Sequence, residues 1–169
     1  YRQLFSPDTE LGRWLATRNT MLRIGRNLFV HAGLSARLLE RDLEMDTLNA
    51  RMSEGLYRTS KERREDPTLE FLYRSAGPVW YRGMVCTDEK YDPLTPEQTD
   101  ALLRRYNADR LLVGHTIFPD ISTFHDGRVI AVNVQNELNR RKNRGRAVLI
   151  EGSRISVVGN RGVKRVLEE

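Results

Sequence analysis

Cysteine is scarce in this sequence, since Cys86 is the only one among 169 residues. A single cysteine excludes an internal disulfide and a cysteine-based zinc site. It is also a weak candidate for a nucleophile, because the residues from Met84 to Glu89 offer no base and place acidic side chains beside the thiol. We therefore expect Cys86 to take no part in chemistry.

Long hydrophobic runs are missing too. No apolar stretch approaches the length of a transmembrane helix, and no signal-peptide pattern opens the chain. With 39% hydrophobic and 30% charged residues, the composition is that of a soluble globular domain with no membrane partner. The chain begins at Tyr1 rather than at a methionine, so the missing leader does not decide between a cytoplasmic and a periplasmic protein.

The charge balance is basic, with a formal net charge of +5. Basic proteins bind nucleic acids, membrane surfaces or anionic substrates. The purest basic run, Arg140 to Arg146, lies between two strand-like segments and holds no aromatic residue on which a base could stack. It favours a polar hairpin loop, although a basic nucleic-acid binder stays open as an alternative function.

Hydrophobic spacing predicts a mixed α/β fold in one domain over residues 1–169. Residues 35–75 form a helical insert in this prediction, and Asp66-Pro67 interrupts the helix that begins after Ser35. A capping box at Thr95 to Gln98 begins a later helix, which leads into a buried strand. Turns at Asp126-Gly127 and Gly152-Ser153 then predict two antiparallel hairpins, with His125 exposed beside the first and a frayed tail from Arg161.

Two short apolar runs each end at a histidine beside a glycine. Residues 28–30 lead into His31, and residues 111–113 lead through Gly114 into His115. Such runs are typical of buried strands, and open α/β sheets place their ligands at the carboxyl ends of the strands. Imidazole there suits a divalent metal ion, although a lone histidine closing a strand is more often a hydrogen-bonded core residue.

A stiff loop at Gly77-Pro-Val-Trp-Tyr-Arg-Gly83 carries a third candidate. A guanidinium matches a phosphate group bidentately, so Arg82 between packed aromatic residues suits phosphate binding. Trp80 and Tyr81 would then border the substrate. The spacing alone allows an alternative equally well, in which both aromatic residues are core and Arg82 covers them.

These segments resemble a known family. Phe29 to Ser35, Gly77 to Gly83, and Val113 to Thr116 followed by Gly127 to Ala131 are similar to the later motifs of calcineurin-like metallophosphoesterases, and especially to the bacterial Shewanella-like protein phosphatases. The resemblance implies a metallophosphoesterase-type β-sandwich flanked by helices, with His31 and His115 as ligands of one ion in a dinuclear site of manganese, iron or zinc. It also implies that Arg82 holds the phosphate of a phosphorylated protein or a small phosphomonoester.

The family's earlier motifs, Gly-Asp-x-His, Gly-Asp-x-x-Asp-Arg-Gly and Gly-Asn-His-Glu, do not occur here. The chain therefore resembles the C-terminal part of a longer enzyme. Metal-dependent phosphomonoester hydrolysis is predicted for that intact enzyme. A noncatalytic fragment with a phosphatase fold stays open as an alternative.

Overall fold

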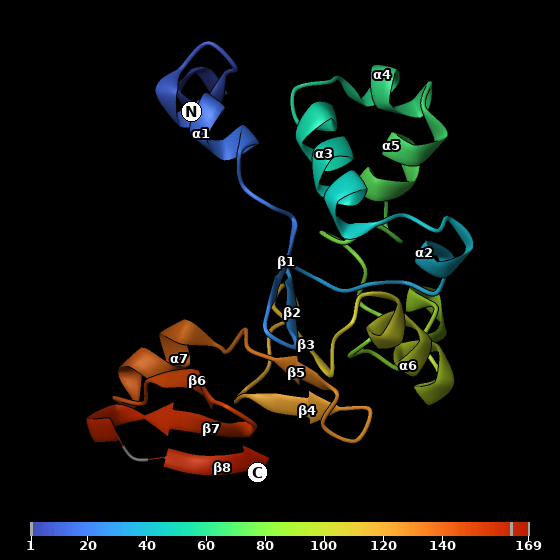
Figure 1. Ribbon diagram of the computed structural model, residues 1–169. Coiled ribbons are helices and arrows are strands. Elements are labelled where there is room, and N and C mark those ends of the chain that lie inside the picture. Colours follow the sequence, from blue (N-terminus) through green and yellow to red (C-terminus); the bar gives the residue numbers. More distant parts are fainter. Residues whose placement is uncertain (1, 163, 169) are drawn as a thin grey trace.

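A five-stranded sheet forms the centre of the molecule in the computed structural model, which describes residues 2–162 and 164–168 (Figure 1). Its strand order is β1-β2-β3-β5-β4, with β1 and β4 at the edges. Strands β2, β3 and β5 are parallel, whereas each edge strand is antiparallel to its neighbour. The strands are β1 (Met21–Ile24), β2 (Asn27–Val30), β3 (Arg110–Val113), β4 (Ser122–Phe124) and β5 (Val129–Ala131). The predicted mixed α/β fold is confirmed.

Alternating side chains of the central strands enter two separate cores. Leu28, Val30, Leu111 and Val113 belong to the larger core, which they share with the helices. Leu112 and Ile130, on the opposite face, pack with Ile155 and Val157 of a second sheet. The central strands therefore read as continuous apolar runs because they are covered on both faces.

The predicted helical stretch after Ser35 is divided into several short helices. They are α2 (Arg37–Glu40), α3 (Met45–Gly55), α4 (Ser60–Arg64) and α5 (Pro67–Tyr73). The predicted break at Asp66-Pro67 is confirmed, because α4 ends at Arg64, and the same pair also begins α5. The Asp66 carboxylate accepts hydrogen bonds from the backbone amides of Thr68 and Leu69, and Pro67 takes the first helical position, where its missing N–H costs nothing.

Helix α6 (Pro96–Arg105) leads into β3 as predicted. The Thr95 side chain accepts a hydrogen bond from the Gln98 amide, and the Gln98 side chain accepts one from the Thr95 amide. The buried residues Leu102 and Leu103 place this helix in the larger core. The capping box therefore fixes where the helix starts, and burial fixes which side faces the sheet.

The C-terminal part differs from the prediction in two places. The predicted second hairpin is present as β6 (Arg146–Glu151) and β7 (Arg154–Gly159), but β8 (Lys164–Glu168) adds a third strand where a frayed tail was expected. The basic run is not a hairpin loop, because Arg140 and Arg141 end helix α7 (Asn136–Arg141). Basic side chains in a last helical turn are favourable to the helix dipole.

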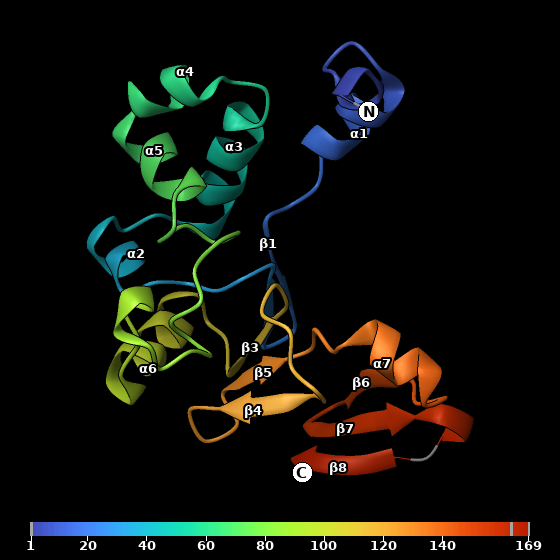
Figure 2. The same cartoon turned by 180° about the vertical axis from the view of Figure 1, so that it is seen from behind.

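The N-terminal helix stands apart from the sheets. Figures 1 and 2 show α1 (Glu10–Ala16) joined to β1 by an extended segment, with the C-terminal sheet at the far end of the molecule. Trp14 of this helix is 53% exposed. Three short 3₁₀ turns complete the elements: η1 (Arg2–Phe5), η2 (Glu89–Tyr91) and η3 (Asn160–Gly162). Among the described residues no helix is long and apolar enough to cross a membrane.

Candidate active site

The two predicted histidines lie side by side at the carboxyl edge of the central sheet. Val30 of β2 pairs in register with Val113 of β3, so the residues that follow both strands emerge together. The Gly114 amide donates a 2.8 Å hydrogen bond to the His31 carbonyl. His31 Nε2 and His115 Nδ1 are 3.2 Å apart, although the residues are 84 positions apart in the chain. The predicted convergence of the two imidazoles is present.

Backbone strain and electrostatics single out His115 within the pair. Its φ of 59° lies in the left-handed region, which is uncommon for residues other than glycine. Its Nε2 atom is buried and has no hydrogen-bond partner among the described residues. Burial lowers the pKa of His115, and the nearby charges of Arg82 and His31 act in the same direction. The neutral ring, which carries a free lone pair, is therefore favoured.

The loop that carries Arg82 is tied to the segment after His31. The Pro78 carbonyl accepts hydrogen bonds from the amides of Ala32 and Gly33 at 3.0 and 3.3 Å. Tyr81 is only 3% exposed, and its hydroxyl donates to the Asp92 carbonyl. Tyr81 therefore anchors the loop, and its predicted contact with substrate stays a prediction.

Arg82 and Trp80 face the histidine pair. Arg82 Nη1 donates a 3.3 Å hydrogen bond to Oγ1 of Thr116, the residue next to His115. The Trp80 ring meets the His115 ring edge-on, with 5.6 Å between the centroids, and Trp80 is 55% exposed. The structure thus brings an exposed aromatic ring and a guanidinium to the same edge as the two imidazoles.

A divalent ion fits the pair, but the pair alone is not a complete metal site. Two nitrogens at about 2.0–2.1 Å from one ion stand roughly 2.9–3.4 Å apart, and the observed separation is 3.2 Å. His115 Nε2 is sterically enclosed, so Nδ1 is the nitrogen available to an ion. Within the described residues no group of three or more histidine, cysteine or acidic side chains could hold a metal. Further ligands would have to come from elsewhere.

His125 differs from the other two histidines. It is half-buried, so the prediction of an exposed residue was wrong. Its Nδ1 lies 3.2 Å from Thr99 Oγ1 and its Nε2 lies 3.0 Å from the Met84 carbonyl. Both ring nitrogens are thus engaged within the protein, and the residue ties the β4–β5 turn to the start of α6.

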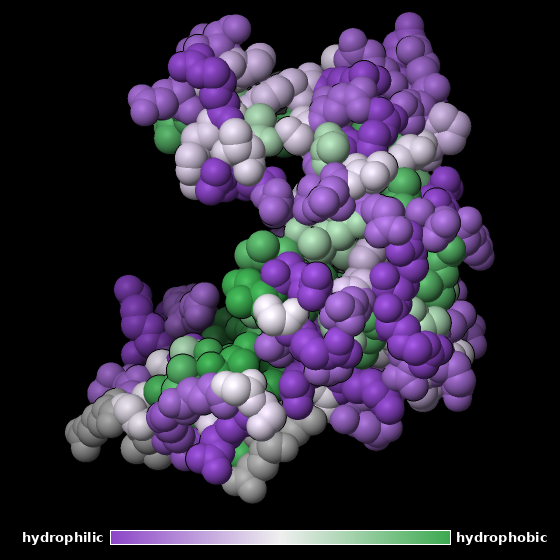
Figure 3. All heavy atoms as spheres, viewed as in Figure 1, coloured by the Kyte–Doolittle hydropathy of each residue, from purple (hydrophilic) through white to green (hydrophobic). Residues whose placement is uncertain are grey.

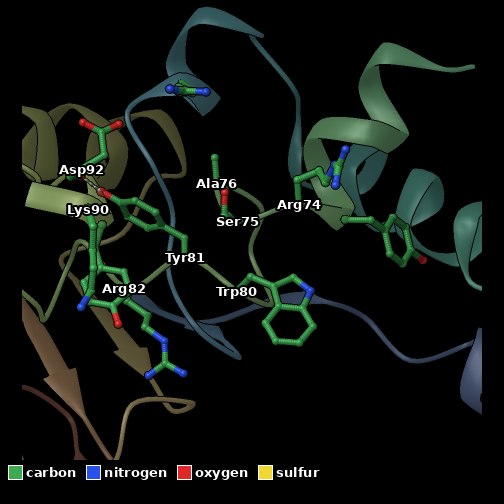
Figure 4. A pocket seen from close by; sticks show the side chains of 11 residues that line it. Arg74, Ser75, Ala76, Trp80, Tyr81, Arg82, Lys90 and Asp92 are labelled. Atoms are coloured by element: carbon green, nitrogen blue, oxygen red, sulfur yellow. Dashed lines mark hydrogen bonds between the residues drawn. The ribbon is translucent and has the colours of Figure 1, made fainter. Parts of the chain in front are cut away.

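A basic pocket adjoins Arg82 and was not predicted from the sequence. Its volume is about 450 Å³, and its lining includes Arg37, Arg74, Arg82 and Lys90. Figure 4 shows Arg74 on one side and Lys90 with Asp92 on the other, with Tyr81, Ser75 and Ala76 between them. Nothing in the spacing of these residues signals their convergence, because it depends on how the segment before α2 is held against the loop after α5 by the hydrogen bond from Ser35 to the Ala76 carbonyl.

An apolar groove lies on the other side of the histidine pair. Its volume is about 570 Å³. Figure 3 shows hydrophobic atoms gathered in the hollow between the N-terminal helix and the C-terminal sheet. The lining combines His31 and Gly114 with apolar side chains of the central sheet and β6: Leu22, Phe29, Val30, Leu112, Val113, Val132 and Val148.

Comparison with known proteins shows a phosphatase-like fold. No family model matches the chain, and no similar curated protein was found. The chain is similar to a solved structure of a cold-active protein tyrosine phosphatase, with a TM-score of 0.87 and 30% identity over 99% of this chain and 47% of that one. The cold-active protein-tyrosine phosphatase of a psychrophilic Shewanella species matches with a TM-score of 0.87 and 29% identity, over 99% of this chain and 48% of that one. The chain spans about half the length of these phosphatases.

Proposed function

We propose that this chain forms part of a metal-dependent phosphatase of the calcineurin-like class, which hydrolyses a phosphomonoester on a protein or a small molecule. The observation that carries the proposal is the 3.2 Å approach of His31 Nε2 and His115 Nδ1 beside Arg82. The 29–30% identity to phosphatases over nearly the whole chain supports the reaction class. The metal and the calcineurin-like class rest on the histidine geometry and on the motifs around His31, Arg82 and His115.

The residues of this chain have distinct roles in the proposal. His31 and His115 hold one divalent ion of manganese, iron or zinc through the two facing nitrogens. When bound, such ions would supply Lewis-acid chemistry, namely polarisation of the phosphate and a lowered pKa of a bound water molecule. Arg82 binds the phosphate oxygens with its guanidinium, which Thr116 orients, and offsets negative charge that develops on them. Trp80 limits how the leaving group lies.

The remaining metal ligands come, in this proposal, from polypeptide that corresponds to the other half of the matched phosphatases. This chain covers 47–48% of those proteins, and its apolar groove opens beside His31. Apolar strand residues exposed in a groove favour burial against another apolar surface. Such docking would bring carboxylates to the edge where the histidine pair, among the described residues, lacks a third ligand.

A phosphatase assay of the intact protein that contains this chain tests the proposal. We expect turnover of a phosphotyrosine peptide or an aryl phosphate with added Mn²⁺, loss of turnover with a chelator, and a decrease of roughly 100-fold or more in His115→Asn. Cys86→Ser separates this from thiol chemistry, and it should retain activity. Turnover that survives the chelator but is lost in Cys86→Ser would contradict the metal mechanism, and no turnover under any condition would support a noncatalytic protein.

A further inference from the structure

Apart from Arg82 and Trp80, the residues that line the basic pocket beside Arg82 have no role in the proposed catalytic steps. Its walls come from three separate segments: the start of α2, the loop after α5, and the stretch around η2. The Ser35 hydroxyl donates a 2.8 Å hydrogen bond to the Ala76 carbonyl, which ties the first two segments together. The Tyr81 hydroxyl donates to the Asp92 carbonyl and fixes the third. The pocket is therefore preformed.

Positive charge dominates the lining of the pocket. Four cationic side chains face one carboxylate, that of Asp92. Arg37 makes no ion pair with any other described residue, and Arg74 has only a loose contact of 3.4 Å with Glu70. Lys90 is partly neutralised by Asp88 at 2.8 Å. The guanidinium of Arg37, and that of Arg74 with its single long contact to Glu70, are therefore available to an anion.

The pocket is continuous with the proposed phosphate site, because Arg82 and Trp80 border both. Its volume of about 450 Å³ lies within the range of pockets that hold a small ligand or a side chain. A group bound there would therefore lie next to a phosphate held by Arg82. The pocket is therefore placed to contact the groups that flank the phosphate in a substrate.

The mixture of groups in the wall favours a peptide over a nucleic acid. A peptide supplies an acidic side chain for the arginines and backbone N–H donors for the Asp92 carboxylate. A nucleic-acid backbone has phosphates at every step and no N–H donors, so nothing in it would offset the repulsion by the Asp92 carboxylate. The aromatic residues Tyr73, Trp80 and Tyr91 give the side-chain stem apolar surface to lie on.

We propose that this pocket binds an acidic side chain of a polypeptide substrate next to the phosphorylated residue, so that Arg37 and Arg74 select acidic phosphopeptides. The inference rests on the proposed phosphatase function and specifies its substrate class. An arginine guanidinium suits a carboxylate because two of its N–H groups can donate parallel hydrogen bonds to the two carboxylate oxygens.

Tryptophan fluorescence offers a direct binding assay. The sequence has two tryptophans, and Trp80 lines the pocket. In Trp14→Phe, Trp80 is the sole tryptophan and reports on ligand binding. Three peptides serve as probes: a phosphotyrosine between glutamates, the same phosphotyrosine between alanines, and the unphosphorylated glutamate peptide. We expect the acidic phosphopeptide to bind roughly tenfold tighter than the alanine phosphopeptide.

Two double variants show whether the preference for the glutamate peptide comes from the pocket arginines or from the positive charge of the whole protein. In the Trp14→Phe background, Arg37→Gln with Arg74→Gln should remove the preference for glutamate, whereas Arg140→Gln with Arg141→Gln removes the same charge from α7 and should leave it intact. Circular dichroism checks that both fold. An equal loss in the two double variants, absence of any glutamate preference, or tighter binding of a single-stranded oligonucleotide overturns the proposal. A glutamate preference without any effect of the phosphate supports the pocket and contradicts the phosphatase function.

Discussion

Three histidines occur in this chain, and they divide into two settings. His125 has both ring nitrogens within hydrogen-bond distance of the Thr99 hydroxyl and the Met84 carbonyl. His31 and His115 instead face each other at the open edge of the sheet, and the enclosed Nε2 of His115 has no partner among the described residues. All three have a turn-like setting, and His115 and His125 share a positive φ.

The difference separates a histidine whose two ring nitrogens are both engaged by the protein from two histidines that meet only each other at the sheet edge. A ring whose nitrogens are both engaged contributes to stability, and its removal leaves buried partners unsatisfied. Two rings whose lone pairs converge gain little from each other, because at most one can donate across the gap. A shared cation satisfies both at once, which is why the pair, and not His125, is the candidate metal site.

Removing one member of the pair should have the largest effect. We expect His115→Asn to weaken Zn²⁺ or Mn²⁺ binding by roughly 100-fold, because a single imidazole cannot chelate. Asparagine tolerates the left-handed backbone at this position, so the fold should be kept. Isothermal titration calorimetry measures the affinity, and an affinity equal to that of the unmodified chain would contradict the pairing.

The converse substitution at His125 should reduce stability instead. His125→Asn removes the ring contacts with Thr99 and Met84 and leaves a buried carbonyl without its donor, at a cost of about 1–3 kcal/mol. Asparagine again suits the backbone, so the two substitutions are matched. Urea denaturation should show the loss while metal affinity stays constant. If His125→Asn keeps its stability but binds metal more weakly, then His125 is a metal ligand and not a structural residue, and the distinction is wrong.

A smaller effect is expected where Arg82 contacts Thr116, beside His115. Thr116→Val keeps the shape of the side chain and removes the acceptor of the Arg82 hydrogen bond. The guanidinium then loses part of its orientation, and affinity for phosphate or vanadate should fall by roughly three- to tenfold. Metal affinity, which depends on the imidazoles, should not change. Competition titrations with inorganic phosphate measure this.

The smallest effect concerns pH and lies away from the histidines. The Arg51 guanidinium and the backbone amides of Leu69 and Thr68 lower the pKa of Asp66. A lowered folded pKa means that this stabilisation is present above the unfolded value of about 3.9 and is lost as the pH falls through the folded value. Asp66→Asn keeps a good helix cap. In this variant the free energy of unfolding, measured by urea denaturation, should depend less on pH in the acidic range, and metal affinity should be unchanged.

The sequence was sufficient to predict the meeting of His31 and His115. Both follow apolar runs of the length of buried strands, and parallel strands present their carboxyl ends at one edge. The Thr95 capping box and the Asp126-Gly127 turn were equally readable, because each depends on a few adjacent residues. Local chemistry therefore predicted the strands, one helix start and the edge that bears the site.

Features that depend on packing were missed. Arg37 and Arg74 reach one pocket because the segment before α2 lies against the loop after α5, and no spacing in the sequence encodes that contact. The division of the predicted helical insert into several short helices was also missed, although its break at Asp66-Pro67 was predicted. Strand β8 is held by antiparallel pairing with β7, and its own residues do not predict this pairing.

The most direct test of the proposed shared metal site is nuclear magnetic resonance of the three imidazole side chains during titration with Zn²⁺. If His31 and His115 bind one ion, their ring-nitrogen signals should shift together and saturate at one equivalent, with His31 shifting at Nε2 and His115 at Nδ1, while the His125 signals stay in place. Independent shifts of His31 and His115, or a shift of His125 at a lower Zn²⁺ concentration than either, would contradict the account.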